Sequence, residues 1–86
     1  MGYQISIITP TGKIFDGAVE STIAPGQEGI FEVLTGHVPM VTVLKNGDVT
    51  LREQTRKLQF SIGSGVLEVD QRHNVLLLTD FAKPTG

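Results

Sequence analysis

The sequence predicts an all-β domain, a flattened β-barrel or two-sheet sandwich of about eight to ten short antiparallel strands. Apolar and polar residues alternate over short stretches, most clearly in Leu58, Phe60 and Ile62 with polar residues between them. Gly, Pro and Asn clusters interrupt these stretches about every eight to twelve residues. Apolar residues never recur with the spacing of an amphipathic helix over about eleven residues, so we expect almost no helix.

The N-terminal strands follow from alternation and from turn residues. Residues 3–9 alternate Tyr, Ile and Ile with polar residues and predict a first strand that ends in the Thr-Pro-Thr-Gly turn at 9–12. Residues 14–23 predict a second strand, with a bulge or kink at Gly17. The apolar run at 30–34, bounded by glycines, predicts the next strand.

The central strands are predicted around one strong turn signal. Residues 40–44 lead into Asn46-Gly47, a dipeptide that tolerates positive φ at both central positions of a two-residue hairpin. We therefore expect residues 40–44 to pair with residues 49–51 across this turn. Residues 58–62 then form a strand with one wet face.

The C-terminal part contains a turn, two strands and a tail. Gly63-Ser64-Gly65 turns the chain into residues 66–69. The Val-Leu-Leu-Leu run at 75–78 predicts a strand that is buried on both faces. Residues 83–86 are expected to fray. With no linker or repeat, residues 1–86 predict a single domain, because a chain of this length holds one core.

Composition and charge exclude several classes of partner. The net charge is −2 and the 7 Lys and Arg residues are scattered, which argues against nucleic acid. No apolar run approaches the roughly 18 residues of a membrane span, and the N-terminus lacks the pattern of a signal peptide, so we expect a soluble, cytoplasmic-facing protein. Cysteine is absent and the core is small. We therefore expect a protein partner to cover one face and to add stability.

No motif indicates catalysis. His37 and His73 are the only histidines, and no third residue stands at a metal-ligand spacing, so no metal is expected. Gly63-Ser64-Gly65 lacks the strand-to-helix setting of a nucleophile and is interpreted as a turn. Gly26-Gln27-Glu28-Gly29 opens no helix and is not followed by a Lys-Ser/Thr pair, so it is not a phosphate-binding loop. We expect a non-enzyme without a cofactor.

The segment 25–40 is unusual because glycines and prolines surround one short apolar strand. It is open to two interpretations: ordinary loops at one end of a sandwich, or a shaped edge that presents Glu28, Ile30, Phe31 and His37 to another protein. Phe31 is expected in the core, and Glu28, which lies between the glycines at 26 and 29, is expected in solvent.

This segment resembles the epsilon subunit of ATP synthases, the equivalent of the mitochondrial delta subunit. Pro25-Gly26-Gln27-Glu28-Gly29-Ile30-Phe31-Glu32-Val33-Leu34-Thr35-Gly36-His37-Val38-Pro39-Met40 is similar to the family pattern Pro-Gly-x-Glu-Gly-x-Phe-Gly-Val-Leu-Pro-Gly-His-Ala-Pro-Leu. The blocks at 9–19, 42–47, 63–69 and 74–80 also resemble the family, and the resemblance covers residues 3–82. Glu32 replaces the usual glycine and Thr35 the usual proline.

The resemblance implies a non-catalytic rotor subunit of the central stalk, which docks the gamma subunit onto the ring of c subunits and couples ion flow to ATP synthesis. It implies a peripheral location on the cytoplasmic side of the bacterial inner membrane or, alternatively, on the plastid thylakoid. The C-terminal helical hairpin of the family is not expected here, and neither is its ATP site. The implied c-ring contacts are Gln27, Glu28, Gly29, Ile30, Phe31 and His37. The implied gamma contacts are Thr9, Pro39, Met40, Val41, Thr42, Ser64 and Val66.

Two other functions stay open from the residues alone. One is a carbohydrate- or protein-binding sandwich module, although the chain holds one Tyr and four Phe, nearly all in strand-like runs. The other is a small hydrolase that uses His37 with Glu28 or Glu32.

Overall fold

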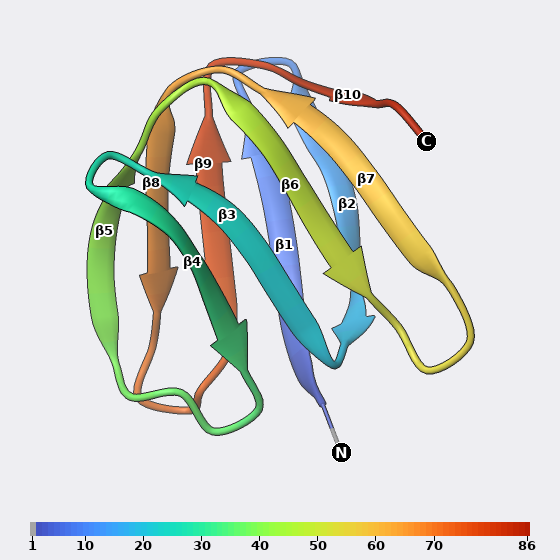
Figure 1. Cartoon of the computed structure of the whole chain (residues 1–86), viewed down its shortest axis with the longest axis vertical. Coiled ribbons are helices and arrows are strands. Elements are labelled where there is room, and N and C mark those ends of the chain that lie inside the picture. Colours follow the sequence, from blue (N-terminus) through green and yellow to red (C-terminus); the bar gives the residue numbers. More distant parts are fainter. Residues whose placement is uncertain (1) are drawn as a thin grey trace.

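The computed structural model describes residues 2–86, which form ten strands and, within that range, no helix (Figure 1). The strands are β1 (Tyr3–Thr9), β2 (Gly12–Val19), β3 (Ser21–Gly26), β4 (Gly29–Leu34), β5 (Met40–Leu44), β6 (Gly47–Arg52), β7 (Lys57–Ile62), β8 (Gly65–Val69), β9 (Val75–Thr79) and β10 (Ala82–Pro84). The predicted all-β class is confirmed.

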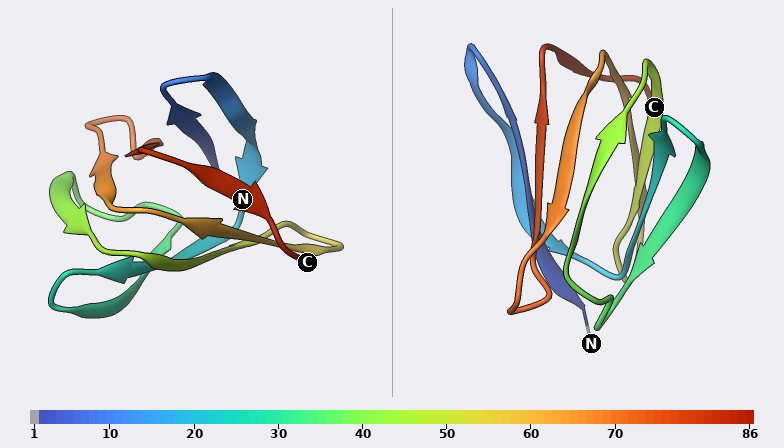
Figure 2. Two further views of the ribbon diagram at one scale, coloured as in Figure 1. Left: turned by 90° about the horizontal axis from the view of Figure 1, so that it is seen from above. Right: turned by 90° about the vertical axis from the view of Figure 1, so that its left-hand side faces the viewer.

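The strands form two layers that face each other across the core (Figure 2). One layer has the order β4-β3-β6-β7-β10, and the other, which we call the second layer, has the order β5-β8-β9-β1-β2. The layers join where Gly26 at the end of β3 pairs with Leu44 at the end of β5, which gives a nearly closed, barrel-like sheet. Most neighbours are antiparallel, as expected, but β1 and β9 are parallel, with Ile5 opposite Val75.

The core follows directly from the alternation in the sequence. Every second residue of β1 points inward, and Ile5 and Ile7 are fully buried. Phe60 and Ile62 of β7 are buried in the same cluster, and Leu58 packs against it. The prediction of one wet face for residues 58–62 is therefore confirmed.

The hairpin predicted at Asn46-Gly47 is wrong. β5 pairs with β8, whereas β6 pairs with β7 and β3, so the dipeptide carries the chain from one layer to the other. Gly47 has no positive φ; instead, a Cβ atom there would lie 2.9 Å from Pro25 Cβ. The glycine is required by this close approach rather than by a turn.

Two further local predictions are corrected. Gly17 lies opposite Ile5 in regular pairing, and the irregularity falls between Ile7 and Ile8, where Ile14 is the extra residue of β2. The tail at 83–86 is not frayed, since Ala82–Pro84 pairs with β7 and the Thr85 amide donates to the Gln59 carbonyl at 2.9 Å. The proline stands in an edge strand, where a missing N–H is tolerated.

The single tyrosine ties the layers together and yields a pH-dependent prediction. The Tyr3 hydroxyl lies 2.7 Å from Thr22 Oγ1 and 2.8 Å from the Val33 carbonyl oxygen. Burial raises the pKa of Tyr3 from 10.0 to about 12, although the Thr22 hydroxyl opposes this and the Glu32 charge adds to it. The folded protein therefore keeps a proton that the unfolded chain releases.

We expect the stability from this group to be fully present below pH 10 and to be lost as the pH rises toward 12. The loss should be about 2 kcal/mol in the free energy of unfolding, measured by urea denaturation along the pH series. The matched variant Tyr3→Phe has no phenol to ionise. An equally steep decline in that variant would contradict the assignment.

Candidate docking surface

Across β5, β8 and β9 the outward face of the second layer is mostly apolar, where an antiparallel sheet that faces water is normally polar. The strand register sets four apolar side chains in one line across β5, β8, β9 and β1. Val43 lies opposite Val66, Val66 opposite Leu78, and Leu78 opposite Ile8. Leu78 at the centre of this row keeps 44% of its surface exposed.

A second row runs beside the first. Val41 lies opposite Glu68, Glu68 opposite Leu76, and Leu76 opposite Ser6. Val41 is 68% exposed. The outer face of the second layer, as we name it, consists of Ile8, Val41, Val43, Val66, Leu76 and Leu78 with Glu68 among them. Contiguous exposed apolar surface of this kind marks interaction sites.

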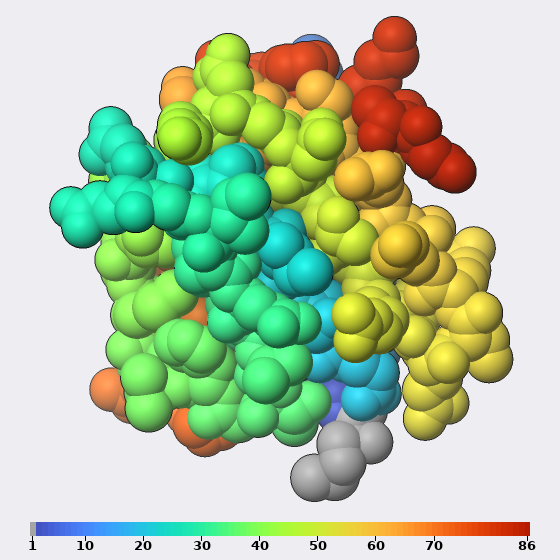
Figure 3. All heavy atoms as spheres, viewed as in Figure 1, coloured from blue at the N-terminus to red at the C-terminus, as the bar shows by residue number. Residues whose placement is uncertain are grey.

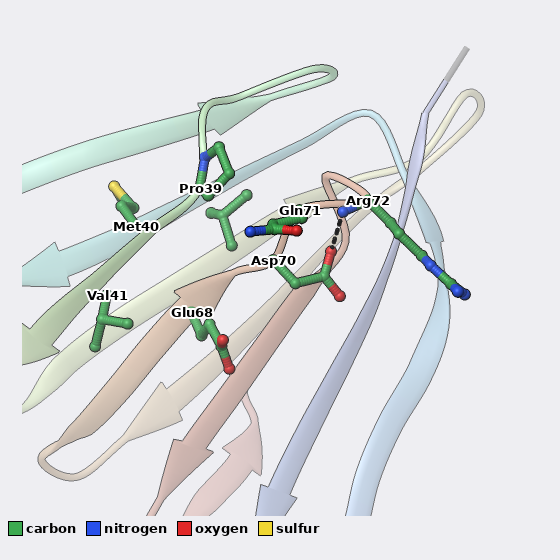
Figure 4. Close-up of a pocket in the computed structure, with 8 residues that line it drawn as sticks. Pro39, Met40, Val41, Glu68, Asp70, Gln71 and Arg72 are labelled. Carbon is green, nitrogen blue, oxygen red and sulfur yellow. Dashed lines mark hydrogen bonds between the residues drawn. The ribbon is translucent and has the colours of Figure 1, made fainter.

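Shallow grooves border this face at both ends. Figure 4 shows the first, of about 640 Å³, with side chains from β5, β8 and the turn after β8. It is lined by Pro39, Met40, Val41, Glu68, Val69, Asp70, Gln71 and Arg72. The second, of about 430 Å³, is lined by Ile8, Thr9, Pro10, Ser64, Gly65, Val66, Leu78, Thr79 and Asp80.

The residues predicted to face gamma lie along this face, but not all point outward. Thr9, Ser64 and Val66 line one groove, and Pro39, Met40 and Val41 line the other. Since side chains alternate along β5, Met40 and Thr42 lie on its inner side, and Met40 packs against the core. Thr9 is buried, and its hydroxyl donates to the Gly12 carbonyl at 3.2 Å, as a turn cap.

Sequence reasoning missed four members of the outer face: Ile8, Val43, Leu76 and Leu78. The prediction that 75–78 is buried on both faces is wrong, because Val75 and Leu77 enter the core while Leu76 and Leu78 point outward. An uninterrupted apolar run describes a strand between two apolar environments. Here one environment is the core and the other is the exposed outer face.

The residues predicted to face the c-ring are centred on a tight hairpin. Gln27 and Glu28 form the two-residue turn between β3 and β4, closed by the Gly26–Gly29 pair. Gly29 has φ +139, and a Cβ at Gly26 would lie 2.7 Å from the Gly29 carbonyl oxygen, so this turn needs both glycines. Figure 3 shows the turn projecting at the upper left.

The turn is exposed but firmly held. The Gln27 amide donates to the Val43 carbonyl at 2.9 Å, which ties the turn to β5 beside the outer face. Glu28 is exposed, as predicted, and Ile30 is 77% exposed. Phe31 is half-buried against the core, with its ring close to Gly26.

His37 does not join this group. It follows β4, whose six residues span roughly 20 Å at about 3.3 Å per residue, so it lies at the other end from Glu28. There His73 Nδ1 lies 3.0 Å from the His37 carbonyl, which joins two loops. Since a carbonyl only accepts, His73 Nδ1 carries the proton. A hydrolase pairing of His37 with Glu28 is contradicted by their separation.

The charges around the outer face are mostly acidic. Glu68, Asp70 and Asp80 line its grooves together with the base Arg72, and Lys13, which is paired with Asp16, lies opposite Ile8 at its β2 border. Asp70 caps its own turn by accepting from the Arg72 and Asn74 amides at 2.8 and 3.0 Å. Residues 2–86 hold no group of three or more His, Cys, Asp or Glu side chains that could bind a metal.

At the β2 end of the second layer, the Lys13 ammonium lies 3.0 Å from the Asp16 carboxylate. This contact, followed by hydrogen bonds from Gln4 and Ser6, lowers the pKa of Asp16. Asp16 is thus an exposed acid whose charge is balanced within the protein. Across the described range, no helix is long and apolar enough to span a membrane.

Comparison with known proteins points to one family. Residues 2–85 match the family model described as the β-sandwich domain of the ATP synthase delta/epsilon chain. The chain is 40% identical to the ATP synthase epsilon chain of Chlorobaculum tepidum over 81 residues, which cover 93% of this chain and 92% of the relative. It is 38% identical to that of Helicobacter pylori strain HPAG1 over 79 residues, 92% of this chain but 63% of the relative.

Solved structures show the same fold. A chain in the Euglena gracilis mitochondrial ATP synthase, a structure of OSCP, F1 and c-ring, superimposes with a TM-score of 0.90 at 24% identity. That match covers 96% of this chain and 53% of the other. A chain in the central stalk and c-ring of the Tetrahymena thermophila mitochondrial enzyme has a TM-score of 0.80 at 16% identity, covering 95% and 66%.

Proposed function

Since the chain belongs to the ATP synthase delta/epsilon chain family, whose members are non-catalytic subunits, we propose that it docks the gamma subunit onto the c-ring within the rotor. In this role it couples ion flow to ATP synthesis as part of the central stalk, peripheral to the membrane on the side that carries the catalytic sector. The observation that carries the proposal is the apolar outer face, which the fold leaves uncovered.

The outer face is suited to gamma. Its centre is aliphatic and flat, and its charged groups stand mostly in the grooves at its border, which is the usual anatomy of a protein interface. The side chains of this face stand on paired strands rather than on loops, so we expect little order to be lost on docking. The outward-pointing members of the predicted gamma set, Pro39, Val41, Ser64 and Val66, all lie on or beside it.

The β3–β4 turn is suited to the c-ring. Gln27, Glu28 and Gly29 are polar or small and exposed, and Ile30 adds an apolar contact. The tie between Gln27 and Val43 transmits force from this turn to the strand that borders the outer face. The proposal places the ring contact at residues 27–30; Phe31 supports it from beneath, and His37 lies elsewhere.

Binding tests this function. Purified chain is expected to bind a gamma-containing catalytic sector that has been depleted of its own epsilon subunit, as measured by surface-immobilised titration. A full-length relative serves as the positive control. If the relative binds and this chain does not, the proposal is wrong.

For the ring contact, Glu28 is suited to pair with a basic residue in the polar loops of the ring. Glu28→Lys is expected to weaken attachment of the reconstituted rotor to the membrane sector by about twofold to fivefold, because one exposed ion pair contributes at most about 1 kcal/mol. Proton-coupled ATP synthesis should fall with it. The control Lys57→Glu reverses an exposed charge at the start of β7, opposite Arg52 at the end of β6 that is remote from Gly47 and the turn. Unchanged coupling in Glu28→Lys would remove Glu28 from the contact.

A further inference from the structure

Glu68 is a single carboxylate inside an apolar surface. Its direct neighbours are Val41 on β5 and Leu76 on β9, and Val66 precedes it on the same side of β8. The diagonal neighbours are Pro39, Val43, Asn74 and Leu78, by the same register. None of these side chains is basic.

The protein does not balance this charge. Within the described range, no side-chain hydrogen bond or ion pair involves Glu68, whereas Asp16 in the same layer binds Lys13 at 3.0 Å. Arg72 is the base nearest in the groove lining, but Figure 4 shows its side chain directed away from Glu68. Glu68 therefore has no charge partner among residues 2–86.

Edge protection does not account for Glu68. Charged residues often guard exposed sheet edges against unwanted pairing, but β8 lies between β5 and β9 and has both edges paired. In this central position a carboxylate between two aliphatic neighbours gains nothing from the fold. We therefore look for the reason for its placement in the partner protein that covers the outer face.

We infer that the partner surface on gamma presents an arginine or lysine directly opposite Glu68, and that this one pair sets the register of the docked subunits. The inference rests on the proposed function, which brings gamma over the outer face. Covering the face removes water from Glu68, and a carboxylate that loses its water without gaining a cation opposes binding. A basic group there converts the penalty into a charge-assisted contact that fixes orientation.

The test compares Glu68→Gln, which keeps the shape and removes the charge, with Glu32→Gln, which removes an exposed charge from β4 in the other layer. Affinity for the depleted gamma-containing sector is measured at low and high salt. Glu68→Gln is expected to bind about 30-fold more weakly, which corresponds to about 2 kcal/mol at 1.4 kcal/mol per tenfold. Glu68→Lys should lose more, and Glu32→Gln should match the wild type.

Whether Glu68→Gln binds more weakly than the wild type decides whether a cation lies opposite Glu68. Equal or tighter binding of Glu68→Gln would mean that the carboxylate meets no cation, and would overturn the inference while wild-type binding upholds the proposed function. Failure of the wild type itself to bind contradicts the proposed function. A weaker dependence of affinity on salt in Glu68→Gln than in the wild type is the second expected result. Since Glu68 is exposed, thermal unfolding should be unchanged in both glutamine variants.

Discussion

Leu78→Asp is expected to weaken binding to the gamma-containing sector by at least about 100-fold while leaving the protein folded. Leu78 occupies the centre of the apolar row, between Val66 on β8 and Ile8 on β1. An aspartate there would be buried on docking against aliphatic side chains, a cost of about 3 kcal/mol, or roughly 100-fold. Because 44% of the side chain is exposed in the free chain, folding itself loses much less.

Leu34→Asp is the matched control. Leu34 is also an exposed leucine in a strand, 54% exposed, but it belongs to β4 in the other layer. Binding by titration and thermal unfolding should be measured for both variants. Comparable losses of affinity would show that any added charge weakens the complex, and normal binding of Leu78→Asp would exclude the outer face as the contact.

Gly65→Ala is expected to lower the free energy of unfolding by about 3 kcal/mol, the largest effect on stability that we predict. A Cβ atom at this position would lie 2.1 Å from the Leu78 carbonyl oxygen and 3.0 Å from the Thr79 Cα. Both are backbone atoms of the paired strand β9, so no side-chain rotation can relieve the contact, and β8 must separate from β9.

At about 4–8 °C per kcal/mol for a domain of this size, the midpoint of thermal unfolding should fall by more than about 10 °C. Gly86→Ala is the control, since its Cβ would meet Gln59 Cβ at 3.5 Å, an ordinary contact. A midpoint in Gly65→Ala within a few degrees of the wild type would contradict the prediction.

The strands could be predicted from the sequence because alternation states which side chains share a face. It does not state which strand lies next to which. Asn46-Gly47 fits a hairpin in isolation, but the close approach of Pro25 to Gly47, a contact between distant parts of the chain, decided the geometry there. Pairing partners depend on such contacts, which local pattern cannot report.

Only part of the candidate site could be predicted, because local sequence pattern does not report contacts between distant parts of the chain. The turn at Gln27 and Glu28 is local, and its glycines reveal it. The outer face, by contrast, is built from four strands that pairing brings together. Val43 and Leu78 are far apart in sequence and share this face only because each lies opposite Val66. In the sequence, an apolar residue on a docking surface looks the same as an apolar residue in the core, so Leu76 and Leu78 could not be distinguished from Val75 and Leu77.

The parallel pairing of β1 with β9 has a consequence for the order of folding. Strand β1 pairs with β2, which follows it directly, but its other neighbour is β9 (Val75–Thr79), far along the sequence, with Ile5 opposite Val75. Contacts so distant in sequence form late and slowly. Leu78 lies on β9 between Ile8 and Val66, so we expect the outer face to be completed only when this long-range pair has formed.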